Sequence, residues 1–268
     1  DFFYGMFTRL FGKKLIVHVH GGKYLTQRPA SPLLNAMIRG LLGFARRVIV
    51  LSDREEQLLE SNYGKYTISV LQNCVEFPAE IQRGENTGRN LRLLFFGRIH
   101  ESKGIWDICE SMQILAQQKK DILLEVYGKG PEQDGFIAAC SKVMGDKFRY
   151  RGVVSGNEKW KVLASYDVLL LPSRYGEGLP MAMLEAMAVG LVVVVTDDAS
   201  VTTVIEDGQN GIVVPKNDPQ SLAEKISFLA DNRAFLHSLG ENARQTIASR
   251  FTKEKYLYNL DAIYKLTI

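Results

Sequence analysis

The chain has 268 residues, of which 46% are hydrophobic and 24% are charged, a globular composition sufficient for one large domain or two modest ones. The formal net charge of +3, with no arginine-rich run or zinc-finger spacing, excludes nucleic acid as an expected partner. No apolar run approaches the length that spans a bilayer, and three cysteines without paired spacing indicate reduced thiols and a cytoplasmic protein.

Strands and helices are expected to alternate in the first part of the chain. Because the expected strands are fewer than the roughly five or six of a doubly wound sheet, we expect residues 1–87 to form an incomplete domain. The chain also starts at Asp1 instead of a methionine, which predicts that a native N-terminal segment is missing. The short apolar runs are Lys14–His18, Val48–Leu51 and Ile68–Leu71, separated by helical patterns at Leu33–Ala45 and Asp53–Asn62.

A polar segment rich in glycine and asparagine, Pro78–Asn90, is the expected linker to a second domain at residues 88–250. Strands that alternate with helices predict an α/β protein with two doubly wound parallel sheets. A last helix, within residues 251–268, is expected to pack back on the first domain. The second set of strands is Arg92–Phe96, Ile122–Tyr127, Phe148–Tyr150, Asp167–Leu171, Val192–Thr196 and Gly211–Val214, and the helices after them are Pro219–Ala230, Arg233–Arg250 and Thr252–Leu266.

Two glutamates follow the expected buried strand that ends at Pro172. Glu177 falls in the loop and Glu185 falls in the next helix, where almost every neighbour is apolar. A lone carboxylate is costly in such surroundings, which favours a functional role over a solvated one. Ligands of open α/β sheets bind beyond the carboxyl ends of strands, so both carboxylates are expected at one crevice, where each can accept hydrogen bonds from paired sugar hydroxyls.

The start of that helix is a predicted phosphate site. Pro180 suits the first turn and Gly190 suits the C-terminal stop. The backbone N–H groups near Gly178 and Leu179 then point from the N-terminus of the helix, where they can bind an anion.

Two cations follow the first strand of the second domain. Gly97 allows a tight turn, and Arg98 and Lys103 lie in the loop beyond it. Arginine binds phosphate oxygens in pairs and lysine supplies a compact charge, so together they can neutralise a leaving diphosphate without a metal ion. Two solvated loop cations are the alternative interpretation.

Two further strand ends offer backbone atoms to a ligand. Gly128 and Gly130 follow the strand that ends at Tyr127, but the third glycine of a dinucleotide-binding fingerprint is absent, so NAD binding is not expected. Plain turn chemistry explains these glycines equally well. Val153 follows the next strand and can present backbone atoms to the edge of a nucleotide base.

A metal site is not expected. His18 and His20 share one face of a strand, but no third ligand is near. Asp197 and Asp198 could bind Mg²⁺, although we expect them to cap a helix over Ser200–Ile205 instead. No Ser-His-Asp or Cys-His arrangement identifies a covalent nucleophile.

The charge is uneven, because the residues from Arg9 to Arg47 include eight basic side chains and no acidic one. Such a face could contact the anionic inner surface of a membrane, as a lipid-linked acceptor would require. An ordinary solvated surface is the other interpretation.

Taken in order, these motifs resemble the retaining glycosyltransferases of family 4, which have the two-domain GT-B fold. Nearly the whole chain takes part in the resemblance. The matching residues are His20-Gly21-Gly22, Asn73–Glu76, Gly97-Arg98 with Lys103-Gly104, Gly128–Pro131, Pro172-Ser173, Glu177–Pro180, Glu185-Ala186, Asp207–Gly211 and Phe251–Tyr264.

The resemblance implies a role for each site residue. Glu185 would hold the ribose hydroxyls of a UDP-, GDP- or ADP-sugar, Glu177 the hydroxyls of the transferred sugar, and Arg98 with Lys103 the diphosphate. His20 would reach the donor sugar from the first domain. Transfer would proceed without a metal ion, with the leaving phosphate accepting the proton of a glycan or lipid-linked acceptor.

Departures from the family pattern leave two alternatives open. The family's opening strand and glycine-rich loop, which help to form the acceptor site, have no counterpart here, and Cys74 replaces the usual glycine after Asn73. The chain could therefore bind a nucleotide sugar without transferring it. A sugar-nucleotide epimerase on the same fold is the other alternative, although acid and base side chains for that reaction are not evident.

Overall fold

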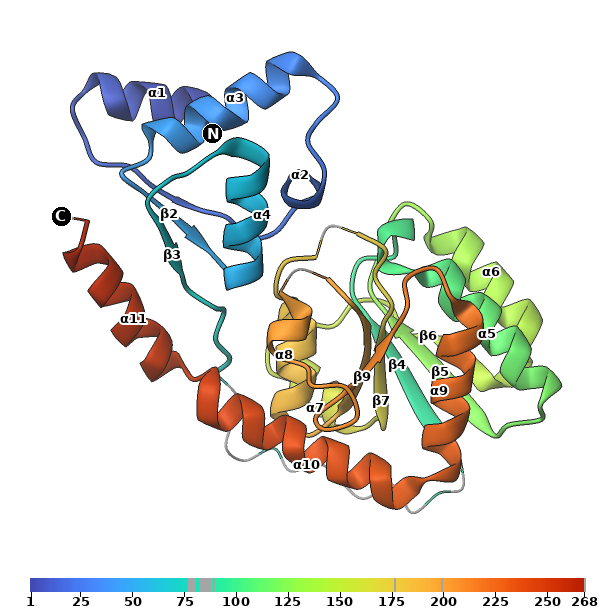
Figure 1. Cartoon of the computed structure of the whole chain (residues 1–268). Helices are drawn as coiled ribbons and strands as arrows, with labels where there is room; N and C mark the ends of the chain where they lie inside the picture. Colours follow the sequence, from blue (N-terminus) through green and yellow to red (C-terminus); the bar gives the residue numbers. More distant parts are fainter. Residues whose placement is uncertain (77–80, 82–87, 89, 176, 199, 268) are drawn as a thin grey trace.

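The computed structural model of the chain describes residues 1–76, 81, 88, 90–175, 177–198 and 200–267. Helices and strands alternate and form two parallel sheets, with the strand orders β1-β2-β3 and β6-β5-β4-β7-β8-β9 (Figure 1). The strands are β1 (Ile16–His18), β2 (Arg47–Val50), β3 (Ile68–Val70), β4 (Leu91–Phe96), β5 (Ile122–Tyr127), β6 (Phe148–Tyr150), β7 (Val168–Leu171), β8 (Val192–Thr196) and β9 (Ile212–Val214).

The helices confirm most of the expected pattern. Expected and observed ends differ by at most one residue at α3, α4, α9 and α11, and α10 agrees at both ends. The α-helices are α1 (Phe2–Leu10), α2 (Lys23–Thr26), α3 (Pro32–Phe44), α4 (Asp53–Tyr63), α5 (Ile105–Gln117), α6 (Gln133–Met144), α7 (Glu158–Ala164), α8 (Met181–Ala188), α9 (Pro219–Asp231), α10 (Arg233–Arg250) and α11 (Lys253–Lys265); the short 3-10 helices are η1 (Glu101–Lys103), η2 (Gly145–Lys147) and η3 (Val201–Thr203).

Side-chain caps explain where several of these helices begin. Ser31 accepts a hydrogen bond from Leu34 N at the start of α3, and Ser52 accepts one from Glu55 N at the start of α4. Asp218 does the same for α9, which has Pro219 in its first turn. Each cap satisfies a backbone N–H that has no partner within the helix, so the sequence marks these starts directly.

The first helix, α1, was not among the expected elements. It lies beside α3 (Figure 1), and Gly5 faces that helix so closely that a Cβ there would lie 2.9 Å from Leu41 Cδ1. A glycine inside a helix lowers its local propensity. The contact with α3 accounts for α1 better than its own sequence does, which explains why a local pattern missed it.

The larger sheet has a hydrophobic core on each face. Along β4, Leu93 and Phe95 belong to the core beneath α5, α6 and α9, whereas Leu94 belongs to the core beneath α7, α8 and α10. This alternation is the two-residue period of a strand that is covered on both sides. The arrangement confirms the predicted α/β fold with parallel sheets.

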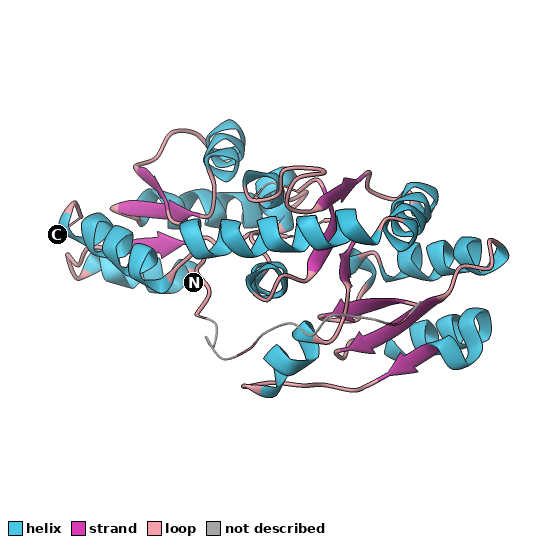
Figure 2. Cartoon of the chain, turned by 90° about the horizontal axis from the view of Figure 1, so that it is seen from below, coloured by secondary structure: helices cyan, strands magenta, loops and turns pink. Residues whose placement is uncertain are grey.

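The C-terminal helices connect the two sheets. In Figure 1, α10 runs below the larger sheet and α11 continues toward β3, and Figure 2, seen from below, has α10 across the front. Ile263 of α11 packs against Ile49 and Leu71 of the first sheet, beside Tyr256 and Leu260. The last helix therefore contacts the first part of the chain. Most of the expected linker at Pro78–Asn90 lies outside the described residues, and the domain boundaries stay a prediction.

Candidate functional site

The larger sheet reverses its strand order next to β4. Strands β5 and β6 follow on one side of β4, while β7, β8 and β9 lie on the other, so the switch point falls between β4 and β7. All neighbouring pairs in this sheet are parallel, which places the loops after β4 and β7 at the same edge. Open α/β sheets bind ligands at such a point.

A cavity of about 660 Å³ lies beyond the ends of β4, β5 and β6. It joins loops that are far apart in the sequence, including five of the residues expected to bind a nucleotide sugar. Its remaining lining comes from the last residues of β4 and β5, the first residue of α6 and the loops after β5 and β6. The five predicted residues are Gly97, Arg98, Gly128, Gly130 and Val153, and the others are Phe96, Tyr127, Lys129, Pro131, Gln133 and Val154.

Close contacts with the backbone require glycine at two of these positions. A Cβ at Gly128, which has a φ of +139°, would lie 1.7 Å from Gly97 O, and a Cβ at Gly130 would lie 1.8 Å from Ile99 O. No side chain fits at either position. The glycines let the loops after β4 and β5 lie against each other, so they form the floor of the cavity whether or not a ligand contacts them.

Arg98 is one of two cations in the lining of this cavity, with Lys129. Its side chain is exposed, and within the described part of the chain its guanidinium has no hydrogen-bond or ion-pair partner. An unpaired guanidinium can bind an incoming phosphate without first breaking an ion pair. The diphosphate role of Arg98 stays a prediction.

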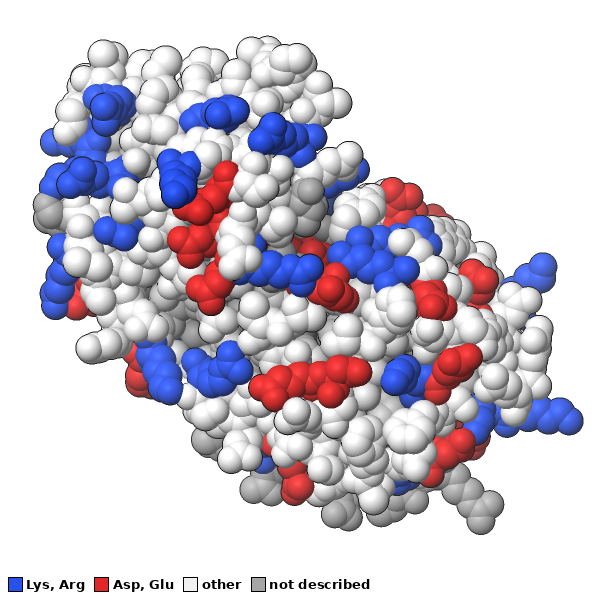
Figure 3. All heavy atoms as spheres, viewed as in Figure 1, with Lys and Arg blue, Asp and Glu red and all other residues white. Residues whose placement is uncertain are grey.

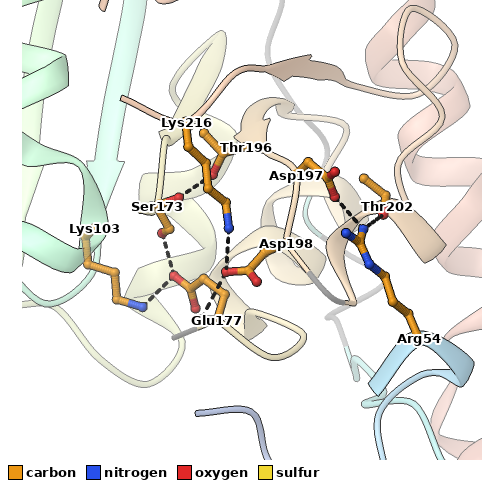
Figure 4. A network of polar contacts seen from close by, with 9 residues as sticks. All are labelled: Arg54, Lys103, Ser173, Glu177, Thr196, Asp197, Asp198, Thr202 and Lys216. Carbon is orange, nitrogen blue, oxygen red and sulfur yellow. Dashed lines mark hydrogen bonds and ion pairs between the residues drawn. The ribbon is translucent and has the colours of Figure 1, made fainter. Parts of the chain in front are cut away.

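Glu177 and Lys103 meet across the switch point. Lys103 Nζ donates to Glu177 Oε1 at 2.5 Å, and Ser173 Oγ donates to the same oxygen at 2.6 Å (Figure 4). The Glu177 side chain is 10% exposed. Among the described residues both hydrogen bonds of this carboxylate reach Oε1, which leaves Oε2 for the hydroxyl of a ligand.

Glu185 has a similar arrangement on α8. Lys159 of α7 donates to Glu185 Oε1 at 2.6 Å, and the carboxylate is 11% exposed. The ammonium group of Lys159 also lies 5.0 Å from the centre of the Trp160 ring. Each predicted hydroxyl-binding glutamate is therefore paired with a lysine at one oxygen. Sequence reasoning missed Lys159, because nothing in its own helix identifies the partner.

The loop that carries Glu177 touches the first part of the chain. A Cβ at Gly21, which has a φ of +83°, would lie 2.5 Å from Gly178 N, so the two backbones are in direct contact. Asn73 Nδ2 donates to Leu179 O at 2.9 Å. Leu179 is buried, and Pro180 is the N-cap of α8 instead of lying in its first turn.

His20 lies next to this contact, directly before Gly21. Its side chain is exposed, and its ring lies 4.0 Å from that of His18, centre to centre. Burial and the nearby His20 lower the pKa of His18 from 6.5 to about 4, so His18 is neutral at physiological pH. Within the described residues no group of three or more His, Cys, Asp or Glu side chains could hold a metal ion.

The expected capping role of Asp197 and Asp198 is wrong. The helix there is the single turn η3, and its N-cap is Ser200. Asp197 instead pairs with Arg54 of α4 at 2.6 Å, and Asp198 accepts a hydrogen bond from Glu177 N at 3.3 Å. Both acids follow the end of β8, so their place at the ligand edge of the sheet was a signal for a site role that the capping interpretation overlooked.

Known proteins resemble this chain in sequence. The family described as "Glycosyl transferases group 1" matches residues 77–246. The alpha-D-kanosaminyltransferase of Streptomyces kanamyceticus is 25% identical over 97% of this chain and 72% of that protein. A putative colanic acid biosynthesis glycosyltransferase, WcaL of Salmonella typhimurium, is 30% identical over 62% of this chain but only 43% of its own length.

Solved structures share the fold. Anabaena Alr3699/HepE in complex with UDP superposes with a TM-score of 0.84 at 17% identity, over 98% of this chain and 75% of that one. Sucrose-phosphate synthase from Thermosynechococcus elongatus gives 0.82 at 18% identity, over 99% and 71%. The chain belongs to the group 1 glycosyl transferases, the retaining glycosyltransferases of family 4, and has their GT-B fold.

Proposed function

We propose that this chain transfers a sugar from a nucleotide-diphosphate sugar to a glycan or lipid-linked acceptor, with retention and without a metal ion. The observation that carries the proposal is the cavity at the ends of β4, β5 and β6, lined by Arg98, together with the Lys103–Glu177 contact at the adjacent switch point. Family membership supports the same reaction class.

The donor would bind along the edge of the larger sheet. The base and ribose would occupy the cavity and the region of Glu185, and the diphosphate would reach Arg98 and Lys103. The transferred sugar would then lie at Glu177, next to His20 of the first part. Solved structures with this fold include complexes named for UDP and for UDP-glucose, which supports a uridine donor without fixing it.

The two cations would carry the chemistry of the leaving group. As the glycosidic bond breaks, negative charge collects on the diphosphate, and fixed positive charges stabilise that charge more in the transition state than before it. The leaving phosphate oxygen would accept the proton of the acceptor hydroxyl while the new bond forms on the same face of the sugar.

Release of free nucleotide tests the proposal. The chain is incubated with UDP-, GDP- and ADP-sugars, with and without glycan or lipid-linked acceptors, and the nucleoside diphosphate is measured. One donor class is expected to react. Arg98→Ala and Lys103→Met should each slow release by about 10-fold or more, since a hydrogen bond to a charged group contributes about 1.5–3 kcal/mol. Lys161→Met, at an exposed position on α7, serves as the matched control.

Binding without transfer is the second candidate, and one observation favours it. The chain spans less than half the length of WcaL and of several other curated relatives, so groups that act on the acceptor can lie outside it. Tight binding of one donor with no release under any acceptor would support this candidate. Neither binding nor release with any donor would contradict both.

We also propose that the first part of the chain contacts an anionic membrane surface from the cytoplasmic side. Phe3, Tyr4 and Phe7 of α1 are more than half exposed, and so is Leu33 of α3. Basic side chains cover the same region in the upper left of Figure 3. Apolar side chains beside positive charge suit a bilayer interface with anionic lipids.

None of the helices in the described part of the chain has the length and apolar character needed to cross a bilayer. Cosedimentation with vesicles tests the surface contact. The chain is expected to sediment with phosphatidylglycerol vesicles. Added salt, or the double variant Phe3→Ser with Phe7→Ser, should weaken this binding. The proposal is contradicted if the same amount of protein sediments with and without vesicles.

A further inference from the structure

Asp198 holds the backbone of the loop that carries Glu177. Its Oδ2 accepts a hydrogen bond from Glu177 N at 3.3 Å, and Lys216 Nζ, from the turn after β9, lies 3.6 Å from the same oxygen (Figure 4). The Asp198 side chain is only 3% exposed. A carboxylate this deeply buried needs hydrogen bonds and a counter-charge, and the two contacts supply them.

The end of β8 fixes the loop at a second point. Thr196 Oγ1 donates to Ser173 O at 2.5 Å, and Ser173 Oγ in turn donates to Glu177 Oε1 at 2.6 Å. The backbone of the loop is thus attached at Ser173 to Thr196, the last residue of β8, and at Glu177 to Asp198, two residues beyond it. Together these contacts fix the backbone position of Glu177 and the direction in which its Oε1 atom points.

Other elements supply further contacts to the Glu177 loop. Lys103 of η1 binds the carboxylate, and Asn73 and Gly21 of the first part meet Leu179 and Gly178. Among the described residues, Asp198 is the side chain that accepts a hydrogen bond from the backbone N–H of Glu177. Removing it would release this backbone, while Lys103 and Ser173 still bind the carboxylate, and would remove no group that is proposed to touch the nucleotide.

We infer that Asp198, supported by Lys216, is a positioning residue for the sugar half of the donor site. It acts through Glu177 and is not itself a catalytic residue. The inference rests on the proposed function, and it deepens it: Asp198 serves recognition of the transferred sugar, while Arg98 and Glu185 serve the nucleoside diphosphate. Loss of Asp198 should consequently weaken the affinity for the sugar conjugate and leave the affinity for the nucleoside diphosphate unchanged.

The neighbouring Asp197 offers a matched control. It is 55% exposed and pairs with Arg54, which is also close to half exposed, so its ion pair is of the surface kind that contributes little. Asp197→Ala removes the same chemical group one residue away. It leaves the hydrogen bond to Glu177 N in place.

The test compares Asp198→Ala, Asp198→Asn and Asp197→Ala with the wild-type chain. Calorimetry measures the Kd of UDP, GDP and ADP and of the matching glucose conjugates, and nucleotide release gives the turnover. For the nucleotide that the wild type binds, Asp198→Ala should keep the Kd of the diphosphate within about 2-fold. It should lose about 10-fold in affinity for the sugar conjugate and in turnover.

The asparagine variant distinguishes positioning from charge. Its side-chain oxygen can still accept from Glu177 N, so Asp198→Asn should recover most of the loss, and Asp197→Ala should match the wild type. Equal weakening of diphosphate and conjugate by Asp198→Ala, or no weakening of either, would overturn the inference while leaving the proposed function in place. A wild-type chain that binds none of the six ligands would overturn both. If Asp198→Ala fails to fold, the ratio of the two Kd values in Lys216→Met decides, because this variant removes the counter-charge of Asp198: a ratio shifted against the sugar conjugate is expected, and an unchanged ratio overturns the inference.

Discussion

Two glutamates of the site differ in the sugar ring that each would bind. Both present one carboxylate oxygen to a lysine, Lys103 for Glu177 and Lys159 for Glu185. A carboxylate has lone pairs for several donors, so the second oxygen of each can still accept from a hydroxyl. The lysines thus hold the carboxylates in place and leave room for the ligand.

This difference predicts that two conservative variants weaken different sets of ligands. Glu185→Gln should weaken the nucleoside diphosphate and its sugar conjugate equally, by about 10-fold, because a charged acceptor of the ribose hydroxyls is lost. Glu177→Gln should weaken only the conjugate. Isothermal titration of both ligands against both variants provides the measurement, and the assignment fails if the two variants behave alike.

His18 predicts a dependence of stability on pH. Its pKa is about 4 in the folded chain and near 6.5 when unfolded, because burial and His20 disfavour the charged ring. The unfolded chain therefore binds the proton first, and stability is lost as the pH falls from about 6.5 toward 4. His18→Phe should reduce this loss.

The melting temperature measured between pH 7.5 and pH 4 checks the effect of His18. Its control is His237→Asn, at a residue on α10 that is 64% exposed and should leave the pH dependence unchanged. A His18→Phe variant that loses as much stability toward pH 4 as the wild type would contradict the prediction.

Among the contacts between elements, the one between the loop after β1 and the loop before α8 should tolerate substitution least. Gly21 follows β1 and Gly178 precedes α8, and the 2.5 Å approach of a Cβ to Gly178 N leaves no space for a side chain. Gly21→Ala should therefore move the first part of the chain away from the Glu177 loop. The positive φ of Gly21 adds a steric cost of its own.

Gly43 on α3 provides a control glycine, at which an added side chain should stabilise the chain. A Cβ there would meet nothing within 4 Å, and the residue lies inside a helix. Gly43→Ala should raise the free energy of unfolding by about 0.5–1 kcal/mol. Gly21→Ala should lower the free energy of unfolding and reduce sugar transfer. Denaturant unfolding measures the first effect and nucleotide release measures the second. A Gly21→Ala chain with the stability and the nucleotide release of the wild type would contradict the importance of this contact.

The elements themselves were largely predictable. All strands of the larger sheet except β6 are short runs rich in Val, Leu and Ile, a composition typical of buried parallel strands. By contrast, α1 depends on its contact with α3, and the turn η3 replaced a longer expected helix. These depend on tertiary contacts, which a local pattern does not contain.

The candidate site was predictable to the extent that it lies at strand ends. Arg98, Gly128 and Val153 were expected together because parallel strands bring their carboxyl ends to one edge, and the cavity joins them. Lys159 was missed, and Asp198 was expected to cap a helix instead of binding the Glu177 loop. Their roles depend on which helix or loop lies opposite, and the spacing of residues in the sequence does not encode that.

In the molecule as a whole, a buried acid lies near the place where α4 of the first part meets the second part of the chain. Glu55 of α4 is fully buried, and its carboxylate accepts from Leu51 N at 2.8 Å. Ser52, at the start of the same helix, lies 2.9 Å from Ser200 of the second part, oxygen to oxygen. Burial, and to a lesser extent the charge of Asp198, raise the pKa of Glu55 above its ordinary value of 4.5.

This acid predicts a stability effect of the opposite sign to that of His18. Because the folded pKa of Glu55 lies above the unfolded one, its contribution to stability is lost as the pH rises from about 4.5 through the folded value. Each unit of elevation corresponds to about 1.4 kcal/mol. Glu55→Gln should therefore raise the melting temperature at pH 7.5 and leave it nearly unchanged at pH 4; an equal change at both pH values would contradict the role of ionisation.

The crevice of the larger sheet is proposed to bind a nucleotide-diphosphate sugar. Isothermal titration of the chain with UDP-, GDP- and ADP-glucose, repeated with Arg98→Ala, measures this binding. The proposed site predicts saturable binding of at least one conjugate with one site per chain, weakened about 10-fold or more by Arg98→Ala. Absence of binding for all three, or binding that Arg98→Ala leaves unchanged, would contradict it.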